Sequence, residues 1–179
     1  MNDIARPETS EYDAFYQTYV AALPDGCILD RLQAQGTECQ QLLATIDDQR
    51  ALYRYADGKW SIKEVLGHLC DAERIFAYRA LTIARGDRVP LPGFDENEYV
   101  AAAGFDRLPL AALAAGLAHV RAATRFLFSS LTSEERARQG LANDSRITVR
   151  ALAWIIAGHE RHHLDVLRER YALGEQTPI

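Results

Sequence analysis

The sequence has few cysteines, no long apolar run and no excess of basic residues. Its three cysteines, Cys27, Cys39 and Cys70, include no CxxC pair, which argues against a disulfide framework and against a zinc finger. No stretch of about 18 uncharged apolar residues occurs, so we expect no membrane-spanning helix. The net charge of −5 gives no general attraction to nucleic acid or to anionic lipid. We therefore expect neither a nucleic acid nor a membrane as a partner.

The first twelve residues also lack the apolar stretch of a signal peptide. Together with the cysteine pattern, this predicts a reduced, cytoplasmic setting. The length of 179 residues and the apolar fraction of 48% are typical of one globular domain, which we expect to span residues 1–179. A chain of this length buries roughly 70% of its unfolded surface, so it needs no metal ion merely to hold its core.

Alternation of apolar and polar residues, the pattern of a half-buried strand, is not found, and helical spacing dominates almost throughout. We expect an all-α fold, a four-helix bundle with additional short helices. The main helices are predicted at residues 29–47, 61–85, 109–131 and 148–173, with shorter ones at 10–23, 95–104 and after 132. The segment 139–147 is predicted as a loop. The long irregular segment 86–108 indicates that the bundle need not run simply up-down-up-down.

The clearest helix start is at Ser61, which is followed three residues later by Glu64. This pair is a capping box, in which each side chain bonds the backbone N–H of the other residue. Apolar residues then recur at helical spacing from Ile62 to Phe76. The capped helix is therefore expected to bury one face in the core.

Three of the five histidines lie at positions where they could bind one metal ion together. His159 and His163 are four residues apart, which puts their rings one turn apart on one face of a helix. That face carries the apolar stripe from Leu152 to Leu167. The pair could hold a metal ion, or it could be two core histidines with hydrogen-bond partners. His162 competes for the role, but the spacing of four favours His163.

His68 lies in the middle of the capped helix, beside its apolar stripe. If the two helices pack together, His68 can face His159 and His163. Three neutral imidazoles around a divalent ion leave one coordination position open, and an open site is of the catalytic type. The predicted metal ligands are therefore His68, His159 and His163.

Other polar and aromatic residues receive more ordinary interpretations. Carboxylates near the histidines in sequence could orient the rings, although each is otherwise expected as a solvated surface charge; these are Asp71, Glu73, Glu160 and Asp165. His119 is expected at the surface or in packing, and Cys70 as a buried thiol. Trp60 and Trp154 are expected to be packing residues.

Two segments resemble the signatures of the DinB/YfiT-like family. The first is WSIKEVLGHLCDAE, from Trp60 to Glu73, and the second is GHERHHLDVL, from Gly158 to Leu167. The PLPGFD segment from Pro90 and the RITVRAL stretch before the last helix also fit, so the resemblance covers about residues 30–172. No nucleophile of the protein itself can be placed from these motifs.

The resemblance implies a four-helix bundle that holds a divalent metal, commonly zinc or nickel, on His68, His159 and His163. It also implies a homodimer. The implied activities depend on thiols: transfer of a low-molecular-weight thiol such as bacillithiol, or a mycothiol-dependent isomerisation. A metal would favour the thiolate, which is a better nucleophile than the thiol.

Three hypotheses follow. The first is a metal-dependent enzyme, S-transferase-like or hydrolase-like, that acts on a small-molecule thiol and an electrophilic substrate. The second is a non-catalytic metal-binding or small-ligand-binding stress-response protein, which predicts a fourth protein ligand such as Glu160. The third is a structural protein, which predicts ring nitrogens more than about 5–6 Å apart, since nitrogen ligands lie roughly 2.0–2.1 Å from zinc.

Overall fold

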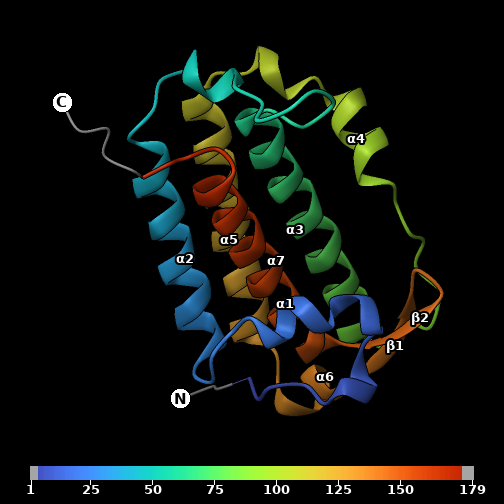
Figure 1. Cartoon of the computed structure of the whole chain (residues 1–179). Coiled ribbons are helices and arrows are strands. Elements are labelled where there is room, and N and C mark those ends of the chain that lie inside the picture. Colours follow the sequence, from blue (N-terminus) through green and yellow to red (C-terminus); the bar gives the residue numbers. More distant parts are fainter. Residues whose placement is uncertain (1–3, 175–179) are drawn as a thin grey trace.

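The computed structural model describes residues 4–174. The long helices are α2 (Ile28–Leu43), α3 (Ile62–Ala84), α5 (Leu110–Ser130) and α7 (Val149–Glu169). The short helices are α1 (Gln17–Ala21), α4 (Glu96–Ala103) and α6 (Ser133–Ala137), with 3-10 turns at Thr9–Glu11, Ala14–Tyr16, Arg50–Leu52 and Phe105–Arg107. Two short strands, β1 (Gln139–Ala142) and β2 (Ser145–Thr148), precede α7. The four long helices form the predicted bundle (Figure 1).

Within the bundle, α3 packs against α5 and α7, and α2 packs against the same two helices. The chain order is up-down-down-up, because the 86–109 segment with α4 returns the chain to the end at which α3 began (Figure 1). Asp48 fixes this end: its carboxylate pairs with Lys63 at the start of α3 and accepts a hydrogen bond of 2.9 Å from the Leu110 N–H at the start of α5. The expectation of a bundle that is not simply alternating is confirmed.

The predicted start of α3 is confirmed in detail. The Ser61 side chain accepts from the Glu64 N–H, and the Glu64 carboxylate accepts from the Ser61 N–H. The apolar stripe from Ile62 to Phe76 is buried throughout. Thr132 and Glu135 form a second capping box at the start of α6.

Helix bounds differ from prediction at several places. Residues 10–23 form two 3-10 turns and α1, because the Asp13 carboxylate caps a new turn by accepting from the Phe15 N–H. The first long helix ends at Leu43 rather than near Asp47. The last helix ends at Glu169 rather than Leu173, and Ala172 adopts a left-handed conformation at φ 51°.

The predicted loop at 139–147 is wrong, since this segment forms an antiparallel hairpin of β1 and β2. Gln139 is paired with Thr148 and Ala142 with Ser145, around a two-residue turn. Asn143 and Asp144 have φ of 51° and 59°, as a type I′ turn requires. Strands of four residues are too short to show clear alternation. The fold remains almost entirely helical, with this hairpin added at one end.

No described helix is long and apolar enough to span a membrane. The three cysteines are free thiols, and Cys39 and Cys70 are buried. Residues 1–3 and 175–179 belong to the expected single domain, but they lie outside the described residues. The extent of the domain therefore stays a prediction.

Candidate metal centre

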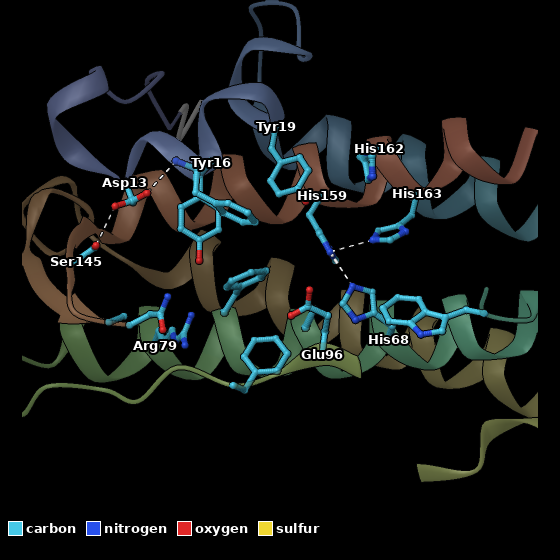
Figure 2. A pocket seen from close by; sticks show the side chains of 17 residues that line it. Asp13, Tyr16, Tyr19, His68, Arg79, Glu96, Ser145, His159, His162 and His163 are labelled. Atoms are coloured by element: carbon cyan, nitrogen blue, oxygen red, sulfur yellow. Dashed lines mark hydrogen bonds between the residues drawn. The ribbon is translucent and has the colours of Figure 1, made fainter. Parts of the chain in front are cut away.

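The three predicted histidines meet between α3 and α7. The Nε2 atom of His159 lies 3.0 Å from His68 Nε2 and 3.2 Å from His163 Nε2. One nitrogen from each ring lies within 4.8 Å of the others. Figure 2 shows the three rings directed toward one another from the two facing helices. The helix packing expected from the sequence is confirmed, and the large separation required by a purely structural role is not found.

Hydrogen bonding alone accounts poorly for this arrangement. An imidazole nitrogen carries either one proton or one lone pair. His159 Nε2 makes both short contacts, so it can form only one good hydrogen bond and would leave the other contact unsatisfied. A shared ion would satisfy all three nitrogens, because ligands about 2.0–2.1 Å from a tetrahedral ion lie a little over 3 Å apart. The donor set therefore fits a divalent metal.

Burial keeps the imidazoles in the form that binds metal. His68 and His159 are buried and His163 is partly buried. Burial lowers the pKa of His68 to about 4, and it holds the pKa values of His159 and His163 well below the usual range, with repulsion among the rings adding to the effect. Neutral imidazole is the form that coordinates a metal, so the lone pairs are available at neutral pH.

His162 does not join the cluster. Its side chain is exposed, and the metal-capable group within residues 4–174 consists of His68, His159 and His163. The His162 ring packs against the His163 ring at a centroid distance of 5.1 Å and against Tyr19 at 5.5 Å. His119 is exposed, as expected. The geometry thus places His163, at the four-residue spacing, beside His68 and His159.

The carboxylates considered as partners of the rings make other contacts. Asp71 pairs with Arg74, and Asp165 pairs with Arg161. The expectation of surface charges is wrong for Glu73 and Glu160. Both are buried and pair with Arg121. The Nδ1 atom of His163 is buried without a hydrogen-bond partner among the described residues. Aromatic side chains, rather than carboxylates, pack against the histidine rings and position them.

The buried cluster of Arg121, Glu73 and Glu160 is the main feature that the sequence did not reveal. Arg121 binds both carboxylate oxygens of Glu73 at 2.8 and 2.9 Å. It also donates to Glu160 and to the Leu32 carbonyl, each at 2.7 Å. One guanidinium therefore joins α5 to the other three long helices. Because the Glu160 side chain binds Arg121, it fixes the rotation of α7 about its own axis. The neighbouring His159 then faces α3.

Aromatic rings surround the three histidines. Trp60 packs on His68 at a centroid distance of 4.8 Å, Tyr19 on His159 at 5.5 Å and Phe76 on His159 at 5.9 Å. Trp60 was expected to serve only in packing, but it also lines the pocket described next. Trp154 is a core residue, as expected, and is 1% exposed.

A pocket of about 500 Å³ opens beside the histidines. Its walls come from α1, α3, α7, the β1–β2 hairpin and the segment around α4 (Figure 2). All three cluster histidines line it, together with four other polar residues, which are Asp13, Arg79, Glu96 and Ser145. A ligand in this pocket could therefore reach the metal-binding nitrogens and these polar groups together.

Comparisons with known proteins match most of the chain, both in sequence and in fold. The model of the DinB superfamily matches residues 31–167. No curated protein sequence matches the chain. The fold is similar to that of YfiT from Bacillus subtilis, described as a probable metal-dependent hydrolase with an unusual four-helix bundle topology. That similarity has a TM-score of 0.68 and 18% identity over 92% of each chain.

The fold is also similar to that of a mycothiol-dependent maleylpyruvate isomerase, with a TM-score of 0.66 and 14% identity. This match covers 80% of the present chain and 60% of the isomerase. The chain thus corresponds to part of that enzyme's length. At these identities the two similarities establish the bundle fold, which agrees with the predicted architecture.

Proposed function

Because this chain belongs to the DinB superfamily, we propose that it is a metal-dependent enzyme that uses a low-molecular-weight thiol. His68, His159 and His163 would hold a divalent ion, zinc or nickel. The observation that carries the proposal is the convergence of three neutral imidazole nitrogens at the wall of an open pocket. When bound, the ion would lower the pKa of a thiol or a water molecule in its open coordination position.

The chain's own residues supply the surroundings that such chemistry needs. Trp60, Tyr19 and Phe76 pack against the histidines and give the pocket an apolar wall beside them. In a thiol transfer, the thiol loses its proton, its sulfur bonds to the electrophilic carbon, and the leaving group departs with the bonding electrons. Glu96 is a carboxylate in the same pocket that could accept the proton. The pocket volume of about 500 Å³ is typical of small-molecule sites.

Hydrolysis is a second candidate, favoured by the same Glu96 carboxylate, which could act as a base toward water. A closed, non-catalytic metal site is less well supported. That alternative required a fourth protein ligand such as Glu160, but Glu160 Oε2 pairs with Arg121 at 2.7 Å. The described metal-capable group contains three ligands, which is the number that catalytic zinc sites use.

The test begins with protein stripped of metal by a chelator and reloaded separately with zinc and nickel. Activity is then measured with several low-molecular-weight thiols against one generic electrophile, and with simple esters and amides for hydrolysis. The proposal expects thiol consumption that requires metal and is lost in His159→Ala but kept in His119→Ala. Metal binding without either activity would favour the non-catalytic alternative.

We also propose that the protein acts as a homodimer in the cytoplasm, with a small-molecule thiol and an electrophile as its substrates. Support for the reducing setting comes from the free thiols, of which Cys39 and Cys70 are buried. Burial raises the pKa of Cys39 to about 12 and that of Cys70 to about 11, so neither serves as a protein nucleophile. Analytical ultracentrifugation measures the oligomeric state directly.

A further inference from the structure

Arg79 is a buried cation in the pocket, and no carboxylate of the described residues forms an ion pair with it. Its side chain is 3% exposed, and its Nη2 atom donates to the Pro92 carbonyl oxygen at 2.7 Å. An arginine stays charged even when buried. Burying a charge without a counter-ion is costly, and local departures from such rules concentrate at functional sites.

The remaining contacts of Arg79 hold its guanidinium in place without neutralising it. The Cζ atom lies 5.8 Å from the Phe76 ring centroid and 6.0 Å from that of Phe94, distances at which a cation interacts with an aromatic face. The charge of Arg79 also counters the rise that burial causes in the Tyr16 pKa. A guanidinium has five N–H donors, so this one can still bind an anion.

The position of Arg79 relative to the histidines suits the two ends of one ligand. Arg79 follows His68 by eleven residues on α3, and Phe76 lies between, with its ring in contact with His159 and with the Arg79 guanidinium. Figure 2 shows Arg79 at the opposite end of the pocket from His68 and His163. The pocket therefore has a metal-binding end and a cationic end, joined by an aromatic wall.

We propose that Arg79 binds a carboxylate at the far end of the ligand whose other end reaches the three histidines. The inference rests on the proposed function and adds the substrate class to it: a small molecule that carries a carboxylate remote from its reacting sulfur or oxygen. A guanidinium and a carboxylate form paired, charge-assisted hydrogen bonds. Arg79 is thus a binding and positioning residue. It favours ligands whose length places the reacting sulfur or oxygen at the histidines.

Two other charged groups face the pocket, and both are acidic. The Asp13 carboxylate is exposed and accepts from Ser145 Oγ at 3.0 Å and from the Phe15 N–H at 2.8 Å. The Glu96 carboxylate is exposed and lines the same pocket. Neither forms an ion pair with Arg79. Glu96 lies beside His68 and would repel a ligand carboxylate from that part of the pocket (Figure 2). Asp13 lies toward the Arg79 end, but its carboxylate is engaged by the two hydrogen bonds just given (Figure 2). Arg79 is therefore the lining side chain that favours the anionic end of a ligand.

The alternative is that Arg79 serves only to fasten the segment at Pro92 to α3. The chain offers a matched control in Arg136, which is 5% exposed, donates to the Phe128 carbonyl at 2.9 Å and likewise forms no ion pair with a described residue. Arg136 lies on α6 and does not line the pocket. Arg136→Gln therefore reports what the loss of a buried, unpaired guanidinium does to the fold alone.

The experiment uses isothermal titration calorimetry on zinc-loaded wild type, Arg79→Lys, Arg79→Gln and Arg136→Gln. The probes are ω-mercaptoalkanoic acids and ω-mercaptoalkanols of equal chain length, which differ only in a carboxylate or a hydroxyl at the far end. Wild type should prefer the carboxylate by about tenfold or more, with a maximum at an intermediate chain length. The preference should disappear in Arg79→Gln, be partly kept in Arg79→Lys, and remain in Arg136→Gln.

A second series separates this inference from the thiol hypothesis. Alkane dicarboxylates are compared with monocarboxylates of equal length, so that an oxygen ligand replaces sulfur at the histidine end. If thiols do not bind but dicarboxylates show the preference that depends on Arg79, the thiol function fails and the inference stands. Equal affinity for charged and uncharged ends in both series, or a preference that persists in Arg79→Gln, would overturn the inference.

Discussion

Gly158 of α7 packs directly against the backbone carbonyl group of Tyr19 on α1, so closely that a Cβ atom at residue 158 would overlap the carbonyl oxygen. This contact brings α1 onto the helix that carries two of the cluster histidines. It also places the Tyr19 ring 5.5 Å from the His159 ring, centroid to centroid. A single glycine thereby determines how closely the pocket wall approaches the candidate metal centre.

Replacing Gly158 by alanine should push α1 away from α7. The overlap is with backbone, which cannot move aside as the end of a flexible side chain can, so we expect the free energy of unfolding to fall by about 1–3 kcal/mol. Urea unfolding measures the change. Gly116→Ala on α5 is the matched control, because a Cβ there meets no atom within 4 Å. That variant should gain up to about 1 kcal/mol from helix propensity, and equal stability of the two variants would contradict the prediction.

The metal centre is tested by single histidine replacements. His159→Ala removes the nitrogen that makes both short contacts, so the bound zinc measured by elemental analysis should fall from about one ion per chain to near zero. His162→Ala is the control, since His162 lines the same pocket but lies outside the cluster. Circular dichroism checks that both variants remain folded. Equal metal loss in the two variants would count against the assigned ligand set.

The cluster could be predicted from the sequence because its members follow helical spacing. His159 and His163 align with the apolar stripe of α7, and His68 lies beside that of α3. Arg79 and Arg121 gave no such signal. A buried charge looks in sequence like a surface charge, and only the packing of α5 against three helices identifies Arg121 as a junction. The β1–β2 hairpin escaped prediction because each strand has only four residues, too few to show clear alternation.

The buried Arg121 junction should dominate the stability of the bundle. Arg121→Met leaves the Glu73 and Glu160 carboxylates buried without their cation, and breaking such a pair costs about 3–5 kcal/mol. Urea unfolding at neutral pH measures the loss. Arg125→Met, one turn along α5 and hydrogen-bonded to an exposed Gln33 side chain, should change stability by no more than about 0.5 kcal/mol. A loss in Arg121→Met as small as that of the control would show that the junction contributes little.

Acid should destabilise the metal-free protein through its histidines. The folded protein holds the pKa of His68 at about 4, against an ordinary value of 6.5, and it holds those of His159 and His163 well below the ordinary range. In the unfolded chain these rings take up protons as the pH falls below about 6.5. The unfolded state then binds more protons than the folded state, so the free energy of unfolding falls as the pH decreases from about 6.5 toward 4.

The control is the variant in which all three cluster histidines are glutamine, and the quantity of interest is the difference in slope between it and wild type. A difference is needed because Glu160 acts with the opposite sign: burial raises its pKa to about 6, so its contribution to stability increases as the pH falls. Added zinc should shift the acid transition of wild type to lower pH, since metal and protons compete for the same nitrogens. Parallel slopes for wild type and the glutamine variant would mean that the rings are not held neutral in the fold.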